Sequence, residues 1–434
     1  MDKMADVLGR AGAWCGQNKY LSAIKNAFQN FMPLTIAGAI GVLWCNVLVN
    51  DQTGLGLFFK PIMALDFLNP AFQAVNFCTI SCITVGITLG IAQEIGVWNM
   101  GAERAGYIPG LVGLAAWLSV TNTSHMVDGA KEAFTGVAGN ELGATGLFTG
   151  MIIGVLSVEL FCFFEKQDAL KIKMPEQVPP GVARAFEVLV PATITLIITA
   201  CIGSACYNLT GLYLNDVIKN GIQGPLGAVG ATVPGVMIIY LVIMLFWLVG
   251  IHGNNMLSAV KEALFTPLAL ENVEAFNKGE TPKNIINMYA LQMWGEFGGS
   301  GVTIGLVIAI MIFGKREDNK AIATLSLVPG LFNINETVTF GIPMVLNPIL
   351  GIPFVFACLV TILVGYVLTV IGFCPVACLT VPWTTPPIVF GFLACGANVM
   401  GAVTQAILIV VSTVIYVPFL IAYEKYQNKQ AAEV

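Results

Sequence analysis

An acidic residue stands inside one of the most apolar regions of the chain, in the stretch FNINETVTFGIPMVLNP. Glu336 follows Asn333 and Asn335, and Pro343 and Pro348 come after it in a run that is otherwise mostly aliphatic. A charged side chain at the depth of a bilayer costs at least about 2.5–3.5 kcal/mol on insertion scales, so it indicates a function. Glu336 is therefore the first candidate for a catalytic and substrate-binding residue.

A second polar cluster follows an apolar run in FWLVGIHGNNML. The run ends at His252, and Asn254 and Asn255 come directly afterwards. Imidazole and carboxamide groups both donate and accept hydrogen bonds. These three residues are candidates for substrate binding.

Two more stretches place polar or aromatic groups in broken apolar segments. In LQMWGEFGGSGVTIG, Glu296 is followed by a glycine-rich stretch that includes Gly299 and Ser300. In LTVPWTTPPIVFGFLACG, Trp383 lies among prolines and threonines. We count these four residues with the substrate-binding candidates, and Asn335 joins them from the stretch around Glu336.

Each candidate also has an ordinary structural explanation. His252 could lie at a membrane interface, and Glu296 could hold a helix end. Trp383 could belong to the aromatic belt of a membrane protein. Glu336 is the hardest to explain in this way, because apolar residues surround it.

Together the clusters contain the side chains that bind hydroxyl groups. Carboxylates and amides form hydrogen bonds with hydroxyls, and an indole ring can cover the apolar face of a sugar. An anionic ligand would call for Arg or Lys, and neither occurs within these clusters. The sequence therefore predicts a neutral polyhydroxyl ligand.

The composition places these clusters in a membrane. Of the 434 residues, 56% are hydrophobic and 10% are charged, whereas soluble domains average about 25% charged residues. This composition predicts an all-α polytopic protein with the lipid bilayer as its solvent. The net charge of -5 gives no nucleic-acid-binding surface. With two histidines and no CxxC pair, we expect neither a metal site nor a cofactor.

Apolar runs recur along the whole chain. We predict about 10 transmembrane helices, each needing roughly 17 to 25 residues. The runs lie at 32–50, 71–92, 106–120, 144–165, 186–206, 232–250, 301–313, 350–373 and 401–423, with shorter or broken pieces at 285–300, 325–347 and 376–397.

Basic residues predict which loops face the cytoplasm. They gather in the N-terminal segment and in the 166–185 loop, whereas the loops at 51–70 and 121–143 hold one each. By the positive-inside rule the first two are cytoplasmic. We expect the N- and C-termini to lie on that side.

The second half does not alternate so simply. Lys261, Lys278 and Lys283 mark 251–284 as a cytoplasmic loop, but 314–320 is basic as well, and only one strong apolar run separates them. The conflict disappears if 285–313 enters the membrane and returns, and 325–347 does the same. Irregular backbone at membrane depth is tolerated only in protein or beside a wet cavity, and broken segments mark transporter binding sites. We therefore predict two re-entrant hairpins.

A charged, proline-bearing segment at 165–187 divides the chain. We expect an N-terminal transmembrane scaffold at 1–174 and a C-terminal transport domain at 175–434. The two re-entrant hairpins belong to the transport domain.

Four stretches carry a resemblance to a known family: MPEQVPPGVARAF, GIHGNN, FGGSG and NINETVTFGIPMVLNP. They resemble the membrane-spanning IIC component of the bacterial sugar phosphotransferase system. Within it they resemble the lactose/cellobiose/N,N'-diacetylchitobiose family, and most of all its diacetylchitobiose-type members. The likeness covers essentially the whole chain, and the motif around Glu336 is the most specific.

The resemblance implies a homodimer in the bacterial plasma membrane, with an N-terminal dimerisation half and a C-terminal transport half. It implies that a separate IIB protein, supplied through IIA, HPr and enzyme I, phosphorylates the sugar from a phosphocysteine. His252 and Glu336 would contact the sugar, with Glu336 near the hydroxyl that receives phosphate. Asn335, Trp383 and the Gly298–Gly301 loop would complete the site.

Three functions compete. The first is phosphotransferase-coupled permeation of a β-linked disaccharide, with no soluble IIA or IIB extension expected in this chain. The second is a proton-coupled secondary sugar transporter in which Glu336 and His252 relay a proton. A self-contained membrane enzyme is less well supported, because no nucleophile triad or Walker-type loop occurs.

Overall fold

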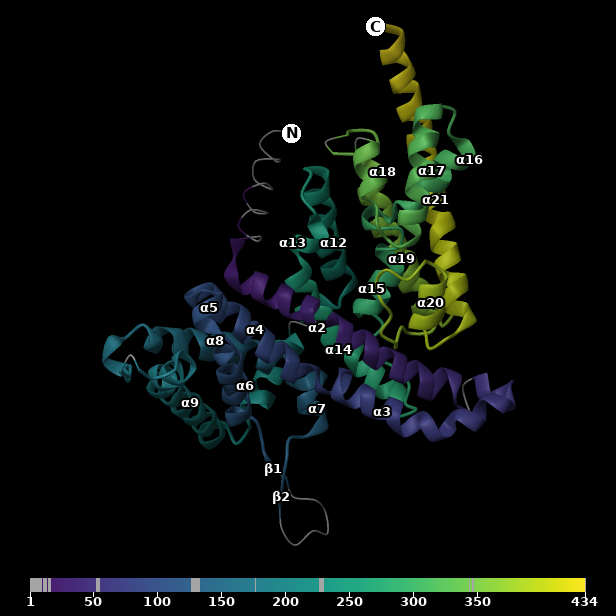
Figure 1. The fold of residues 1–434 in the computed structure, drawn as a ribbon. Coiled ribbons are helices and arrows are strands. Elements are labelled where there is room, and N and C mark those ends of the chain that lie inside the picture. Colours follow the sequence, from purple (N-terminus) through teal and green to yellow (C-terminus); the bar gives the residue numbers. More distant parts are fainter. Residues whose placement is uncertain are drawn as a thin grey trace. The chain divides into compact units, whose positions relative to one another are not determined.

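Helices account for nearly all regular structure in the computed structural model (Figure 1). The structure describes every residue except 1–9, 11–13, 15–16, 52–54, 126–132, 176, 226–229, 343, 346 and 434. Within that part, the strands β1 (Ser124–His125) and β2 (Phe134–Thr135) form a two-stranded antiparallel sheet in which Ser124 faces Thr135.

Up to residue 225, short helices separate several long ones. The α-helices and the 3-10 and π turns are α2 (Lys19–Leu43), η1 (Trp44–Leu48), η2 (Leu55–Leu57), η3 (Lys60–Leu68), α3 (Asn69–Cys78), η4 (Ile80–Cys82), α4 (Ile83–Met100), α5 (Ala102–Ala105), α6 (Ile108–Val120), α7 (Gly139–Leu142), α8 (Ala144–Glu165), η5 (Asp168–Leu170), α9 (Pro180–Thr210), α10 (Leu214–Ile218) and η6 (Lys219–Gln223).

From residue 230 onward the helices are interrupted more often. They are α12 (Val233–Leu248), α13 (Gly253–Met256), α14 (Ser258–Asn277), α15 (Met288–Gly295), η7 (Ser300–Val302), α16 (Ile304–Phe313), α17 (Glu317–Leu331), α18 (Glu336–Gly341), α19 (Gly351–Val370), α20 (Val389–Ala394) and α21 (Val399–Glu433).

Long apolar helices confirm the multi-pass membrane class. Among the described residues, six helical segments are long and apolar enough to cross a bilayer, or seven if the bent pair at 288–313 forms one span. The runs at 106–120 and 232–250 form helices of 13 and 16 residues, α6 and α12, which fall short of the usual span. The expected total of about 10 transmembrane helices stays a prediction.

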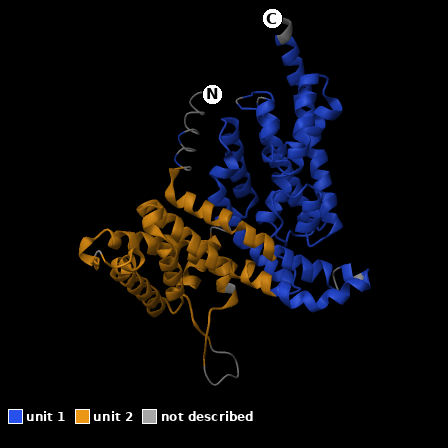
Figure 2. Ribbon diagram, in the orientation of Figure 1, with its two compact units in different colours: residues 1–16, 39–73, 228–434 blue, residues 17–38, 74–227 orange. Residues whose placement is uncertain are grey.

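The chain divides into two compact units, which Figure 2 colours separately. Unit 1 comprises residues 1–16, 39–73 and 228–434, and unit 2 comprises 17–38 and 74–227. The boundary that we placed between 174 and 175 stays a prediction.

Unit 2 is built around α4. Its residues Ile83, Ile87, Ile91 and Ile95 recur every four positions, so they share one helix face, and all four are buried. α4 packs against both α6 and α8. Close approach depends on small side chains, as in membrane helices generally: a Cβ on Gly113 of α6 would lie 2.3 Å from the Cβ of Ala92.

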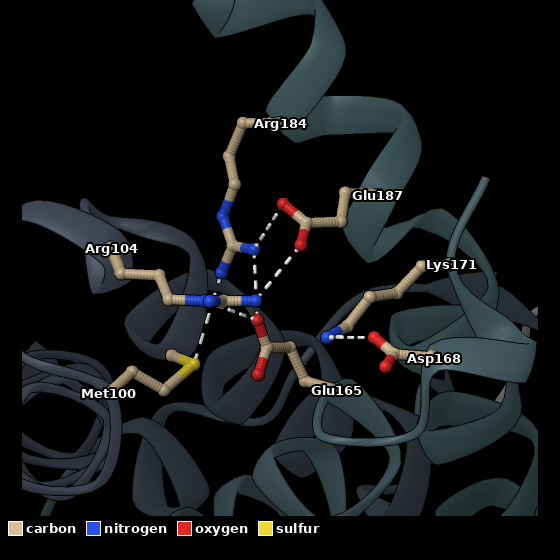
Figure 3. A network of polar contacts seen from close by, with 7 residues as sticks. All are labelled: Met100, Arg104, Glu165, Asp168, Lys171, Arg184 and Glu187. Carbon is tan, nitrogen blue, oxygen red and sulfur yellow. Dashed lines mark hydrogen bonds and ion pairs between the residues drawn. The ribbon is translucent and has the colours of Figure 1, made fainter. Parts of the chain in front are cut away.

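An ion cluster joins α5, α8 and α9 in unit 2 (Figure 3). Glu165, at the end of α8, accepts hydrogen bonds from Arg104 Nε and Arg184 Nη1, both at 2.9 Å. Glu187 of α9 bonds both guanidinium groups as well. The Glu165 side chain is only 3% exposed. Its charge is therefore compensated by two cations, as burial requires.

Unit 1 is organised around α21. This helix packs against α16, α19 and α20, and α19 in turn packs against α12 and α15. Small residues again permit the contact, since a Cβ on Gly305 of α16 would lie 2.3 Å from Ser412 Oγ. These long helices frame the segments that carry the candidate site.

Two interruptions lie within this frame. Residues 296–303 separate α15 from α16, and the two arms are bent by 59°, which suits either a broken span or a re-entrant loop. Helices α17 and α18 pack against each other across the turn at 332–335. Pro343, which falls in the second expected hairpin at 325–347, lies outside the described residues. Re-entry of both segments into the membrane stays a prediction.

Candidate functional site

His252 and Glu336 lie close together in unit 1. The Nε2 atom of His252 is 3.9 Å from Oε1 of Glu336. Both side chains remain accessible, with 38% and 47% of their surfaces exposed. Two chain segments more than 80 residues apart in the sequence therefore bring an imidazole and a carboxylate to one place.

A helix cap fixes the His252 ring. Its Nδ1 accepts a hydrogen bond from the backbone N–H of Asn255 at 3.3 Å, which caps α13. The ring also lies against Trp247, with centroids 4.5 Å apart. In a neutral imidazole that accepts at Nδ1, the proton is on Nε2. His252 therefore presents an N–H toward Glu336.

Glu336 opens helix α18, and Asn335 precedes it. The Asn335 side chain is buried and its Nδ2 donates to the carbonyl oxygen of Ser300 at 2.8 Å. A negative charge in the first turn of a helix is stabilised by the unpaired N–H groups there. The hydrogen bond of Asn335 thus anchors the carboxylate-bearing turn to the glycine-rich stretch.

The glycine-rich stretch approaches Asn335 more closely than a larger residue allows. Gly299 has φ +87°, and a Cβ there would lie 2.6 Å from the Cβ of Asn335. Only glycine adopts such a conformation readily. Gly299 therefore belongs to the site through its backbone, because it lets two segments meet.

Asn254 contacts the same stretch from α13. Its Nδ2 donates to Ser300 Oγ at 2.9 Å. Ser300 thus connects to Asn254 through its hydroxyl and to Asn335 through its carbonyl. Asn255 is exposed beside them and contributes its backbone N–H to His252.

The hydrogen-bond donors to Glu296 could not be predicted from the sequence. Its Oε1 accepts hydrogen bonds from Tyr240 Oη at 2.7 Å and from Lys261 Nζ. We expected 251–284 to be a loop and the clusters to contain no cation. The structure corrects this: Lys261 lies at the start of helix α14 and is only 6% exposed. A buried lysine therefore stands among the candidate residues.

Asn333 is a second residue that the candidate set omits. Its Oδ1 accepts from Gly298 N at 2.6 Å, and its Nδ2 donates to the carbonyl oxygens of Trp383 and Thr385. It thereby links three segments. Its sequence signal was its position beside Glu336 in an apolar stretch. Trp383 is 44% exposed.

The arrangement offers polar groups from several segments that are far apart in the sequence, and no group of residues suited to holding a metal ion is found among the described residues. Glu336 can accept a hydroxyl hydrogen bond, and His252 Nε2 can donate one. Glu336 can also take a proton from a hydroxyl that reacts. This chemistry suits a polyhydroxyl ligand that is bound and then acted on at one oxygen.

Comparison with known proteins assigns the chain. Residues 25–358 match the family described as the phosphotransferase system EIIC. The chain belongs to that family. It is therefore a multi-pass sugar permease of the phosphotransferase system, and an EIIC component implies a sugar substrate and a partner IIB component. The resemblance seen in the sequence is confirmed.

Relatives of this EIIC protein extend over nearly its whole length. The oligo-beta-mannoside-specific EIIC component of Bacillus subtilis (strain 168) is 33% identical over 98% of this chain and 94% of its own. The cellobiose-specific EIIC component of Lactococcus lactis subsp. lactis (strain IL1403) is 29% identical over 98% of both.

A solved structure is also similar. It is that of the transporter ChbC, the IIC component from the N,N'-diacetylchitobiose-specific phosphotransferase system. The TM-score is 0.88 at 29% identity, covering 97% of each chain. The EIIC protein therefore has a ChbC-like fold.

Proposed function

We propose that this EIIC protein translocates a β-linked disaccharide, of the cellobiose or N,N'-diacetylchitobiose type, across the bacterial plasma membrane and presents it to a IIB protein. The names of the relatives support this sugar class, because they include cellobiose, oligo-beta-mannoside and N,N'-diacetylchitobiose systems. We also propose that it acts as a homodimer with cytoplasmic termini.

The observation that carries the proposal is the approach of His252 to Glu336 beside Asn254, Ser300 and Asn335. Amides and a serine hydroxyl fix the segments, while the imidazole and the carboxylate stay accessible. A sugar hydroxyl placed between them would accept from His252 Nε2 and donate to Glu336. Both contacts orient that one oxygen.

Phosphoryl transfer then follows from this placement. The sugar hydroxyl oxygen forms a bond to phosphorus while the phosphorus–sulfur bond of the IIB phosphocysteine breaks, and the cysteine leaves as a thiolate. Glu336 accepts the hydroxyl proton. The transition state requires attacking and leaving atoms roughly in line, so holding the acceptor oxygen is the main task of this chain. The phosphoryl donor belongs to IIB.

Transport assays test this function directly. Inverted membrane vesicles carrying the protein are loaded with radiolabelled cellobiose or N,N'-diacetylchitobiose, and phosphoenolpyruvate, the soluble phosphotransferase proteins and IIB are added outside, at the cytoplasmic face. We expect sugar phosphate to appear outside only when IIB is present. Release of free sugar without IIB, abolished by removing a pH gradient, would instead establish proton-coupled transport.

A further inference from the structure

Lys261 is buried within the site, so its charge must be met by neighbouring side chains. Its residue is 6% exposed, and its Nζ donates to Glu296 Oε1 and, at 3.3 Å, to Asn254 Oδ1. The neighbouring Glu262 hydrogen-bonds Thr266 instead. Glu296 is therefore the carboxylate that pairs with Lys261.

Tyr240 contacts the same oxygen of Glu296. Its hydroxyl donates to Oε1 at 2.7 Å, and Tyr240 is completely buried. Both donors thus occupy one side of the carboxylate. No hydrogen bond to Oε2 is found among the described residues, and 17% of the Glu296 side chain remains exposed. The geometry leaves Oε2 as the oxygen that can receive another donor.

Lys261 also sets the orientation of Asn254. Because an ammonium group only donates hydrogen bonds, its contact requires the amide oxygen of Asn254 to face Lys261. The amide nitrogen then faces Ser300 Oγ at 2.9 Å. The carbonyl oxygen of Ser300 in turn accepts a hydrogen bond from Asn335, which precedes Glu336. One ammonium group therefore orients an acid and an amide on two sides of the site.

Stability alone is a poor reason to keep this pair. Replacing a buried ion pair by apolar residues is often neutral or stabilising by about 1–4 kcal/mol, whereas removing one partner is strongly destabilising. A benefit to the site would explain why both charges are present. The sequence already offers apolar residues at most neighbouring positions of α12 and α15.

We propose that Lys261 and Tyr240 are positioning residues that hold Glu296 with Oε2 turned toward a sugar hydroxyl, while Lys261 also orients Asn254. This inference rests on the proposed function, because it requires a sugar at the site. Neither residue needs to touch the sugar. Tyr240 is fully buried, its hydroxyl contacts Glu296, and the Lys261 ammonium lies 5.5 Å from the centre of its ring.

Equilibrium binding to the purified full-length protein tests the inference. Dissociation constants for cellobiose and N,N'-diacetylchitobiose are measured by calorimetry, together with thermal melting and gel filtration in detergent. Lys261→Met is compared with Lys261→Arg, Tyr240→Phe and Glu296→Gln, and with the double variant K261M/E296Q. Lys278→Met is the matched control, because Lys278 lies just after the same helix and its side chain is 58% exposed.

We expect Lys261→Met to raise the dissociation constant about tenfold or more, since hydrogen bonds to charged groups are the stronger ones. Lys261→Arg should restore binding to within about threefold, and Tyr240→Phe should weaken it about threefold or more. The dissociation constant of K261M/E296Q should be no higher than that of the weaker-binding of Lys261→Met and Glu296→Gln, because the effects of substitutions at contacting residues are not additive. Lys278→Met should bind like the wild type.

Unchanged binding by folded Lys261→Met would overturn the inference, as would additive effects in the double variant. If Lys261→Met does not fold, Tyr240→Phe decides: a melting curve and a dissociation constant like those of the wild type would overturn it. A wild-type protein that binds neither disaccharide would overturn the proposed function itself, and this inference with it. Binding by the wild type with no effect of these substitutions would overturn the inference alone.

Discussion

At the scale of single residues, two carboxylates share the site but have different surroundings. Glu336 is 47% exposed and has His252 Nε2 at 3.9 Å. Glu296 is 17% exposed and is held by Tyr240 and Lys261. A carboxylate held by fixed donors is suited to orienting a ligand, whereas an accessible one is suited to accepting a proton. We therefore propose that Glu336, and not Glu296, accepts the hydroxyl proton.

Replacing Glu336 by glutamine should separate binding from phosphorylation. Glutamine still accepts a hydrogen bond through its carbonyl oxygen, so the sugar dissociation constant should rise by less than about tenfold. It cannot accept the hydroxyl proton, so the rate of sugar phosphate formation should fall by about 10²- to 10⁴-fold. Calorimetry and a IIB-dependent phosphorylation assay measure the two quantities.

The control for this substitution is Glu317→Gln. Glu317 lies at the start of α17, and its side chain is 87% exposed. It should leave both quantities unchanged. Equal phosphorylation rates for Glu336→Gln and the wild type would remove Glu336 from the reaction.

The sequence indicated Glu336 and His252 because a charged or ionisable group among apolar residues is expensive. It did not indicate Lys261. The helix α14, SAVKEALFTPLALENVEAFN, contains several other charged residues, so its hydropathy is that of an exposed segment. The partner of Lys261 lies 35 positions away, and only the tertiary structure brings Glu296 to it.

At the scale of the elements, breaks in helices determine where the site lies. Gly298, Gly299 and Gly301 all have positive φ in the connection between α15 and α16. Asn333, also at positive φ, hydrogen-bonds this connection and the stretch at 383–385. Prolines and glycines in the sequence predicted that these segments were broken. The contacts between breaks could not be predicted, because they depend on hydrogen bonds between segments far apart in the chain.

A pair of glycines tests the importance of the close approach at Gly299. Gly299→Ala places a Cβ 2.6 Å from Asn335 Cβ, which should cost about 1–3 kcal/mol as overpacking. Gly279 also has positive φ, but no atom lies within 4 Å of a Cβ there. Both variants place an alanine at positive φ. Gly299 also has ψ −176°, in a region that essentially only glycine occupies, so the difference between the variants reports the contact together with this additional backbone strain.

We expect Gly299→Ala to raise the sugar dissociation constant about tenfold, since a displacement of about 1 Å at such a site is costly. Gly279→Ala should bind sugar like the wild type, with a slightly lower melting temperature. Calorimetry and melting curves in detergent measure both effects. Equal sugar affinities for the two variants would show that the approach of Gly299 to Asn335 does not matter for binding.

At the scale of the whole molecule, hydropathy predicted the membrane class and most long helices correctly. It could not predict the composition of the two compact units. Unit 1 joins residues 39–73 to residues 228–434, which are far away in the sequence. Such an assignment depends on tertiary packing, and no local composition records it.

The orientation of the chain in the membrane is a prediction at this scale. The basic residues of the 166–185 loop predict that it lies in the cytoplasm. Green fluorescent protein fused after residue 434 should fluoresce, because it folds in the cytoplasm. Alkaline phosphatase fused after Asn122, in a loop expected outside, should be active. An inactive phosphatase together with a dark fluorescent protein would reverse the predicted orientation.

The ion cluster around Glu165 also has a practical value for protein engineering. Arg184 Nη1 donates a hydrogen bond to Glu165 Oε1 at 2.9 Å, so the two ends of the connecting loop are held together. Lys173 is exposed in this loop. Lengthening a closed loop costs only about 0.6 kcal/mol for each doubling of its length. A small soluble domain inserted at Lys173 would therefore give electron microscopists a visible marker while the helices on either side keep their anchor.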